Sequence, residues 1–289
     1  MRVAVVGARG QLGAAVVHEL QPDHDVVGLA RADLDIDDPR AVGALMARVG
    51  PGAIINCAGY NAVDAAEDHP VDALRTNAFA VRSLARAAAA ADALFITCST
   101  DFVFDGTVDQ PHVEEDQPNP RSVYAASKLL GEWFAADVPR GYVLRVESLF
   151  GRAPRGPAAK GSAEGILSAI RAGSVARVFE DRTVSPTYVI DGAKAIRTLL
   201  GGTIQPGLYH CVNSGSCTWL EFALEAARQM GVAPRIERIK VVDVPLRAER
   251  PKFCALSNAK LAAAGVVMPD WRDALRRHIQ AEELRSSGT

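Results

Sequence analysis

A tyrosine and a lysine four positions apart, Tyr124 and Lys128, are the residues of this sequence best suited to acid–base chemistry. At this spacing the phenol and the ammonium lie one turn apart on the same face of a helix. A free phenol, with a pKa of ~10, exchanges protons poorly at neutral pH, but a fixed cation beside it favours the phenolate and lowers that pKa. We therefore predict that Lys128 makes Tyr124 a usable acid or base.

Two hydroxyl side chains and a carboxylate, Ser99, Thr100 and Asp101, follow an apolar run at residues 94–98 that is typical of a buried strand. Open α/β sheets bind ligands at the carboxyl ends of their strands, so these side chains are placed for chemistry. The alternative is a simple helix cap or turn. Asn77, on the preceding helix, is either a surface amide or a group that orients the lysine through water.

Three glycines, Gly7, Gly10 and Gly13, separate a predicted strand at residues 2–6 from a predicted helix at 11–20. A backbone that approaches a pyrophosphate carries no side chains at the contact points, and the free N–H groups at a helix start favour the anion. The spacing G-x-x-G-x-x-G differs from the G-x-G-x-x-G fingerprint of dinucleotide sites. The strand–turn–helix context nevertheless predicts a dinucleotide site here.

The end of the second predicted strand bears on which dinucleotide is bound. A carboxylate there binds a ribose 2′-hydroxyl, whereas an arginine accepts a 2′-phosphate. The strand ends at Ala30 and Arg31, with no acid at its tip, and Arg9 lies in the glycine loop. This favours NADPH, with NADH kept as the alternative; the other interpretation is that both arginines are ordinary solvated residues.

Short apolar runs alternate with helical patterns through the first half of the chain, as in a parallel sheet covered on both faces. We predict an α/β fold with a doubly wound, Rossmann-type parallel sheet. The predicted strands are 2–6, 25–29, 53–57, 94–98 and 142–146, and the predicted helices are 11–20, 39–49, 71–91 and 122–134.

The alternation weakens after Gly151, where residues 152–165 are rich in Gly, Pro and Ala and predict a mobile loop. We predict a smaller, mainly C-terminal α/β substrate lobe from four further elements: a strand at 207–212, a helix at 219–230, a strand at 236–242 and a helix at 271–284. The expected division gives residues 1–150 plus about 185–215 to the dinucleotide-binding domain, and about 151–184 and 216–289 to the substrate lobe.

Composition excludes several classes of protein. The 289 residues include 32 basic and 34 acidic side chains, which gives a net charge of -2. There is therefore no surplus of positive charge for binding nucleic acid. No apolar stretch approaches the roughly 20 residues that span a bilayer, so we predict a cytoplasmic protein without a membrane partner.

The five dispersed cysteines indicate small buried thiols in a protein of a reducing compartment. The histidines lack the spacing of metal ligands, so no metal site is predicted. Glu114, Glu115 and Asp116 lie between prolines in a loop and are expected to be solvated. Trp271 is expected to pack in the core.

The glycine loop, residues 99–106 and the Tyr124/Lys128 pair together resemble the extended short-chain dehydrogenase/reductases, specifically the dTDP-4-dehydrorhamnose reductase branch. The resemblance covers nearly the whole chain. Further matching segments are residues 56–67, 186–187, 207–210, 250–251 and 268–271.

The resemblance implies a role for each matching residue. Tyr124 would be the proton donor, Lys128 would bind the nicotinamide ribose and lower the tyrosine pKa, and Thr100 would hold the substrate carbonyl oxygen. The predicted cofactor set is Gly7, Arg9, Gly10, Gln11, Leu12, Gly13, Arg31, Asp35, Ile36, Cys57, Ala58, Gly59, Asn77, Cys98 and Lys128. The predicted substrate set is Thr100, Asp101, Phe102, Tyr124, Ser148 and Arg250.

Two departures from the family pattern concern the substrate. Ser148 stands where the family has a tryptophan near the nucleotide base. Phe102 stands where related sugar-nucleotide dehydratases carry a glutamate; dehydration needs that second acid, so reduction is favoured.

We therefore predict an NADPH-dependent (alternatively NADH-dependent) reductase that transfers hydride to the keto group of a nucleotide-linked deoxysugar. The alternatives are a non-catalytic dinucleotide-binding regulatory subunit, and an epimerase or dehydratase of the same superfamily. The intact set of Thr100, Tyr124 and Lys128 argues against a pure binder. A homodimer is a family expectation.

Overall fold

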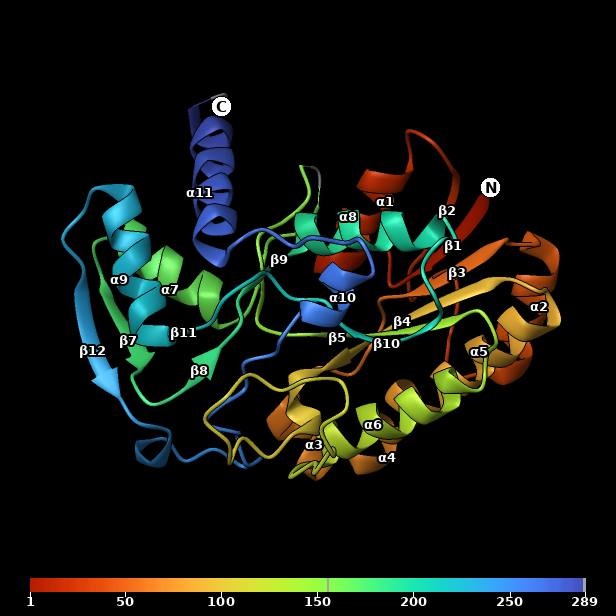
Figure 1. Ribbon diagram of the computed structural model, residues 1–289, viewed down its shortest axis with the longest axis horizontal. Coiled ribbons are helices and arrows are strands. Elements are labelled where there is room, and N and C mark those ends of the chain that lie inside the picture. Colours follow the sequence, from red (N-terminus) through yellow and green to blue (C-terminus); the bar gives the residue numbers. More distant parts are fainter. Residues whose placement is uncertain (155, 288–289) are drawn as a thin grey trace.

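A computed structural model describes residues 1–154 and 156–287 of the chain (Figure 1). Its centre is a six-stranded parallel sheet in the order β10-β5-β4-β3-β1-β2, which confirms the predicted doubly wound α/β fold. The strands are β1 (Arg2–Val6), β2 (Asp25–Leu29), β3 (Ala53–Asn56), β4 (Leu94–Thr100), β5 (Gly141–Val146) and β10 (Gly207–His210).

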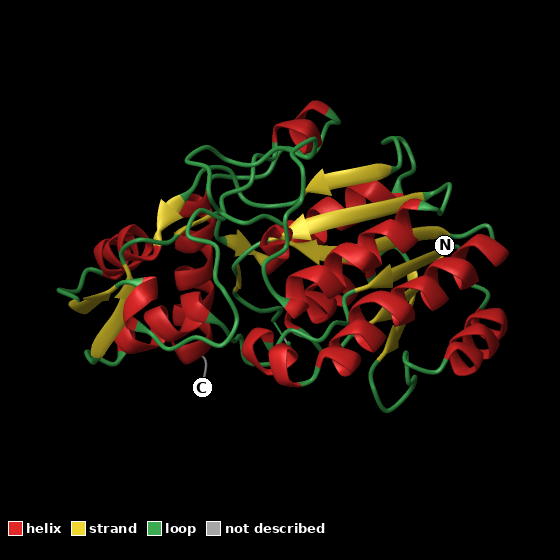
Figure 2. Ribbon diagram, turned by 90° about the horizontal axis from the view of Figure 1, so that it is seen from below, coloured by secondary structure: helices red, strands yellow, loops and turns green. Residues whose placement is uncertain are grey.

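Helices cover both faces of this sheet (Figures 1 and 2). One face carries α1 (Gln11–Leu20) and α8 (Val189–Leu200), and the other carries α2 (Pro39–Val49), α5 (Ala80–Ala90) and α6 (Val123–Ala136). Along β1, Val3 and Val5 belong to the first core and Ala4 to the second. Successive side chains of a strand point to opposite faces, so an uninterrupted apolar strand serves both cores.

The sheet changes winding direction at β1, which pairs with β2 on one side and β3 on the other. The connections that leave β1 and β3 therefore diverge and open a crevice, the usual ligand position in such sheets. Hydrogen bonds fix its walls: the Gly7 N–H donates to the Leu29 carbonyl at 2.9 Å, and the Cys57 N–H donates to the Val6 carbonyl at 2.9 Å.

A third core lies beside the sheet and is built by the C-terminal half of the chain, whose elements form a separate group in Figure 1. Its parallel strand pair, β7 and β12, packs with α7, α9 and α11. Trp271 is buried in this core, as expected. The elements are α7 (Ser162–Arg171), β7 (Val175–Phe179), β8 (Thr183–Val184), β11 (Cys217–Thr218), α9 (Trp219–Met230), β12 (Arg235–Ile239), η3 (Val241–Asp243) and α11 (Trp271–Ser287).

The structure corrects several local predictions. The predicted helix at 71–91 is divided into α4 (Pro70–Leu74), the π-helical turn η1 (Arg75–Phe79) and α5. The predicted loop is shorter than expected, because α7 begins at Ser162, after Gly161 adopts a φ of 104°. The short helix α3 (Val63–Asp68) was not predicted, and neither was α8.

One C-terminal segment returns to the first core. Helix α10 (Ala259–Ala263) places Leu261 there, and Met268 packs in the same core. The division of the chain into a dinucleotide-binding domain and a substrate lobe remains a proposal. Among the described residues, no helix combines the length and apolar character needed to cross a bilayer.

The glycine loop generates a stability prediction. A Cβ on Gly13 would lie 2.2 Å from the Gly7 carbonyl oxygen, so Gly13→Ala forces two backbone segments apart. We expect a loss of about 1–3 kcal/mol in the free energy of unfolding, measured by denaturant titration.

The matched control is Gly43→Ala on α2, where an added Cβ would meet nothing within 4 Å. Alanine is the better helix former, so this variant should gain about 0.5–1 kcal/mol. Equal effects of the two substitutions would contradict the close approach at Gly13.

Candidate functional site

Tyr124 lies in the first turn of α6, just after the N-cap residue Ser122, whose hydroxyl accepts a hydrogen bond from the Ala125 N–H at 3.2 Å. The tyrosine is buried, and the Thr100 side chain at the end of β4 lies near enough to its hydroxyl to lower the pKa of that hydroxyl. The Phe102 ring packs edge-on against it, with the ring centroids 5.7 Å apart. The structure thus brings the predicted phenol and hydroxyl together.

The expected effect of Lys128 on Tyr124 is wrong for this structure. Burial raises the pKa of Tyr124, and the Thr100 side chain and the charge of Arg250 only partly oppose that rise. The Lys128 Nζ instead donates to the Cys98 carbonyl at 2.7 Å. Burial also lowers the pKa of Lys128 itself. The phenol is therefore held in its protonated form.

Lys128 nevertheless faces the predicted cofactor crevice. A Cβ built on Gly59 would lie 3.4 Å from its Nζ, so the ammonium sits against the loop that follows β3. Cys57, just after β3, and Cys98, near the end of the neighbouring strand β4, lie close enough in the same region to affect each other's pKa.

Asn77 is not a surface amide, and its expected role of orienting the lysine through water stays a prediction. It is buried in the π-helical turn η1, where its Oδ1 accepts from the Tyr60 N–H at 2.8 Å. Its Nδ2 donates to the Tyr60 carbonyl and to the Ser127 hydroxyl, both at 3.0 Å. The amide therefore ties the loop after β3 to α6. π-helical turns occur frequently at functional sites.

A cavity of about 300 Å³ lies in the crevice between the ends of β1, β2 and β3. Eight residues of the predicted cofactor set line it: Gly7, Gly10, Arg31, Asp35, Ile36, Cys57, Ala58 and Gly59. Lining residues that were not predicted include Asp37, Tyr60, Asn61 and Thr76. The other predicted residues lie outside the described lining: Arg9, Gln11, Leu12, Gly13, Asn77, Cys98 and Lys128.

The backbone around this cavity fits a dinucleotide. Gly7 has a φ of 77°, and a Cβ there would lie 2.7 Å from the Ala58 backbone nitrogen. Gly10 is the N-cap of α1 and makes no side-chain cap, which leaves N–H groups at the helix start for an anion. Gln11 turns away from the cavity, and its Nε2 donates to the Gly151 carbonyl at 2.8 Å.

The rim of the cavity at β2 carries charges of both signs. Arg31 is exposed and lines the cavity together with Asp35 and Asp37. Burial raises the pKa of Asp37, against a lowering hydrogen bond from Thr76. The Asp33 carboxylate is already bonded within its own loop, because it accepts a hydrogen bond from the Ala30 N–H at 2.8 Å. Arg31 is thus the cationic group of the lining at this strand tip.

Two arginines flank Phe102, a residue of the predicted substrate set. The Cζ atoms of Arg182 and Arg250 lie 5.2 and 5.7 Å from the centroid of the Phe102 ring. Arg250 pairs with Asp64 at 2.9 Å, while its buried Nη1 has no hydrogen-bond partner among the residues that the structure describes.

A buried cluster of charged groups behind Thr100 was missed at the sequence level, apart from Asp101. Asp101, Glu147 and Cys254 place one polar atom each within 4.8 Å of one another. Burial raises the pKa of Asp101 to about 6 and raises that of Glu147 as well. Arg182 lies against the cluster, with its Nη2 3.5 Å from the Cys254 Sγ. The sequence feature that could have indicated this cluster is Glu147, an acidic residue directly after the central strand β5.

Ser148, a predicted substrate residue, is half-buried in the connection between β5 and β6 (Leu149–Phe150). Its φ of 45° is unusual for a residue other than glycine, which marks a constrained backbone. The Ser148 carbonyl accepts from the N–H of Thr187, at 3.3 Å, in β9 (Thr187–Tyr188).

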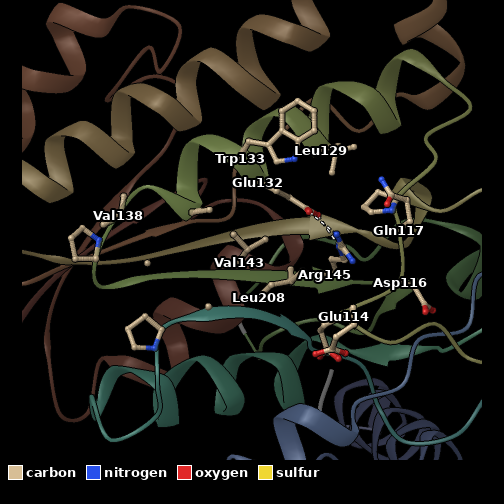
Figure 3. A pocket seen from close by; sticks show the side chains of 17 residues that line it. Glu114, Asp116, Gln117, Leu129, Glu132, Trp133, Val138, Val143, Arg145 and Leu208 are labelled. Atoms are coloured by element: carbon tan, nitrogen blue, oxygen red, sulfur yellow. Dashed lines mark hydrogen bonds and ion pairs between the residues drawn. The ribbon is translucent and has the colours of Figure 1, made fainter.

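A larger cavity, of about 530 Å³, opens beside α6, β5 and β10 (Figure 3). It shares no lining residue with the crevice cavity. Glu132 and Arg145 form a buried ion pair at 2.8 Å on its wall, and Ser99 donates to the same carboxylate. Ser99 is therefore engaged away from Tyr124.

The prediction that Glu114 is solvated in a loop is wrong. Its side chain is buried, and its carboxylate accepts a hydrogen bond from the His210 N–H at 2.7 Å.

Known proteins resemble this chain over almost all of its length. A family model described as the RmlD substrate binding domain matches residues 1–284. The dTDP-4-dehydrorhamnose reductase of Burkholderia thailandensis is 34% identical over 292 residues, which cover 95% of this chain and 97% of that protein.

Solved structures agree with this similarity. A dTDP-4-dehydrorhamnose reductase from Clostridium acetobutylicum superposes with a TM-score of 0.91 at 30% identity, covering 98% of this chain and 100% of that one. The enzyme of the same name from Bacillus anthracis, in complex with NADP, gives a TM-score of 0.89 at 30% identity, with 96% and 98% covered.

The buried acids generate a pH prediction for Glu147→Gln. Because burial raises the pKa of Glu147 above 4.5, the folded protein keeps a proton that the unfolded chain releases as the pH rises. Wild-type stability therefore falls with rising pH in this window, and an uncharged glutamine removes that fall. We expect the unfolding midpoint of the variant to gain more at about pH 8 than at about pH 5, measured by calorimetry.

Glu237→Gln, an exposed carboxylate on β12, is the control and should show the same small change at both pH values. A Glu147→Gln gain that is independent of pH would contradict the prediction.

Proposed function

The chain belongs to the RmlD substrate binding domain family, and from this membership we propose that it is an NADPH-dependent reductase acting on the keto group of a nucleotide-linked deoxysugar. The observation that carries the proposal is that the buried Tyr124 phenol meets the Thr100 side chain at the carboxyl end of the sheet, where Thr100 acts on its pKa. This pair lies beside a crevice that fits a dinucleotide, as described above. The names of the relatives, dTDP-4-dehydrorhamnose reductases, support a sugar nucleotide as substrate.

When bound, the nicotinamide supplies the hydride. The chain supplies the proton: the Tyr124 phenol donates it to the substrate oxygen as that oxygen gains negative charge. A pKa raised by burial suits this role, because the phenol stays protonated until the alkoxide forms. Thr100 lies beside the phenol and is assigned to hold the carbonyl oxygen.

Lys128 is assigned to the ribose of the nicotinamide half, because its ammonium already faces the Gly59 loop. In that role its contact with the Cys98 carbonyl keeps the side chain extended across the ends of β3 and β4. The crevice loops orient the cofactor, which is the main contribution of the fold to hydride transfer.

On the substrate side, Phe102 and Arg250 form a wall next to Tyr124. The unpartnered Nη1 of Arg250 is a donor for an anionic or hydroxyl-bearing group of the substrate. Asp101 and Ser148 complete the proposed substrate residues. We keep NADH as the alternative cofactor, and a homodimer and a cytoplasmic location as predictions.

Tyr124→Phe tests the proton donor. The variant removes the donating hydroxyl without changing the ring, so turnover should fall by about 10²–10⁴-fold. Cofactor affinity should change little, because the substitution leaves the glycine loop intact. The measurements are loss of NADPH absorbance with dTDP-4-dehydrorhamnose and cofactor titration by fluorescence.

The matched control is Tyr209→Phe, which removes a hydroxyl bonded to the Gln205 carbonyl at 2.8 Å on β10. Its turnover should stay near that of the wild type. Unchanged turnover in Tyr124→Phe would refute the assignment, and tight cofactor binding without reduction of any keto sugar would favour the regulatory-subunit alternative.

Arg31→Ala tests the cofactor preference. If Arg31 binds the 2′-phosphate, its loss should weaken NADPH binding about tenfold, equivalent to about 1.4 kcal/mol, and NADH binding far less. Arg48→Ala, at an exposed arginine of α2, should weaken neither. An equal loss for both cofactors would show that Arg31 is not the selective residue.

A further inference from the structure

The short helix α3 carries three acidic side chains that bond to segments far from it in the sequence. Asp64 and Asp68 bond to the loop that follows η3, and Glu67 bonds to the start of α6. Spacings of three and four residues put all three acids on one face of the helix. Helix α3 therefore connects the C-terminal part of the chain to the helix that carries Tyr124.

Glu67 holds the first residue of α6. Its Oε1 accepts a hydrogen bond from the Val123 N–H at 2.8 Å. The N–H groups of a first helical turn have no partner within their helix, and an anion beside them is favourable. The first turn of α6 contains no acidic residue of its own, so Glu67 supplies this anion from α3. Tyr124 is the next residue after Val123, and its place depends on that of the turn.

Apolar contacts join the same two helices. Ala66 of α3 and Tyr124 of α6 are buried members of one small core, and Val63, Val123 and Phe102 pack against it. Close-packed interiors transmit small displacements. A shift of α3 would therefore move the surface against which the Tyr124 ring packs.

Asp64 makes two contacts with the loop that follows η3. Its Oδ1 accepts a hydrogen bond from the Ala248 N–H at 3.0 Å, and its Oδ2 lies 2.9 Å from the Nη2 of Arg250. A guanidinium is planar and rigid, so fixing Nη2 also fixes the direction in which Nη1 donates. Asp64 thus sets the orientation of the arginine that we assign to the substrate.

The neighbouring arginine gives Arg250 a second reason to need this carboxylate. Arg182 and Arg250 both lie against the Phe102 ring. Burial lowers the pKa of Arg250, Asp64 opposes that fall, and the like charge of Arg182 adds to it. Without Asp64, repulsion between the two guanidinium groups would favour conformations in which Arg250 points into solvent.

We propose that Asp64 and Glu67 are positioning residues for the reduction: Glu67 sets the place of the proton donor Tyr124, and Asp64 sets the orientation of Arg250 toward the substrate. The inference rests on the proposed function, in which Tyr124 and Arg250 serve one reaction. Arg250 contributes to substrate binding, whereas proton donation by Tyr124 matters only in the transition state. Loss of the two acids should therefore change different kinetic constants.

Steady-state kinetics with NADPH and dTDP-4-dehydrorhamnose separate the two roles. Asp64→Asn leaves one acceptor oxygen where two are used and removes the charge that pairs with Arg250. Its KM should rise about 10-fold, with kcat within about 2-fold of wild type. Glu67→Ala should lower kcat about 10-fold and leave KM within about 2-fold, because misplacing a proton donor lowers the rate rather than the affinity.

Two further variants control for charge and for general destabilisation. Glu67→Gln can still accept from the Val123 N–H, so its kcat should return to within about 3-fold of wild type. Asp68→Asn is the matched control for Asp64, because Asp68 lies on the same helix and pairs with Arg247 of the same loop. That pair is exposed to solvent, where ion pairs contribute little, so both kinetic constants should stay near wild type.

A double-variant comparison tests whether Asp64 acts through Arg250. Arg250→Ala should raise KM by itself, and adding Asp64→Asn should raise it by less than about 2-fold more, because the partner is already absent. Adding Glu67→Ala to Arg250→Ala should still lower kcat about 10-fold. If the effects of Asp64→Asn and Arg250→Ala simply multiply, the role of Asp64 is overturned.

The kinetics of the single variants also decide the inference. Equal changes of kcat and KM in Asp64→Asn and Glu67→Ala would mean general destabilisation and overturn it, as would wild-type kinetics in both. A kcat of Glu67→Gln as low as that of Glu67→Ala would overturn positioning through the Val123 N–H.

Amide hydrogen exchange, measured by NMR, distinguishes failure of the inference from failure of the proposed function. The Val123 N–H should be protected in the wild type and should exchange about 10-fold faster in Glu67→Ala but not in Glu67→Gln. An active wild type whose Val123 N–H is unprotected loses the inference alone. A wild type that protects this N–H but reduces no keto sugar loses the proposed function, and the inference falls with it.

Discussion

Parallel pairing in fixed register is the constraint on which the site depends. Asn56 pairs with both Val6 and Thr97, and Thr100 pairs with Val146, so β1, β3, β4 and β5 all end at one edge of the sheet. Each residue that follows such a strand reaches the same crevice. A slip of one residue in any of these pairings would turn its chemistry-bearing side chains to the other face.

The sequence patterns predicted the sheet well because its strands are short apolar runs that must be buried on both faces. The spacing of Tyr124 and Lys128 placed them on one helix face, and the position of Thr100 after a central strand placed it nearby. The helix α8 was not predicted because it follows two very short strands, β8 and β9, where periodicity is interrupted.

What sequence could not predict depends on contacts between distant segments. Asp101, Glu147 and Cys254 come from three parts of the chain, and no local pattern announces that they meet. The same holds for Asn77, whose bonds to Tyr60 and Ser127 need the π-helical turn. The pKa of Tyr124 was misjudged because helix spacing gave the neighbouring cation but not the burial that opposes it.

The π-helical turn at Arg75–Phe79 also bears on how the chain tolerates changes of length. Such a turn accommodates one more residue than an α-helical turn, so shortening it by one residue leaves a regular α-helix in its place. Every residue between the deletion and the end of the helix would then rotate by about 100° relative to the N-terminal part. Homologues that differ by a single insertion or deletion in this segment would therefore differ in which side chain buttresses the crevice, although their hydrophobic pattern looks almost the same.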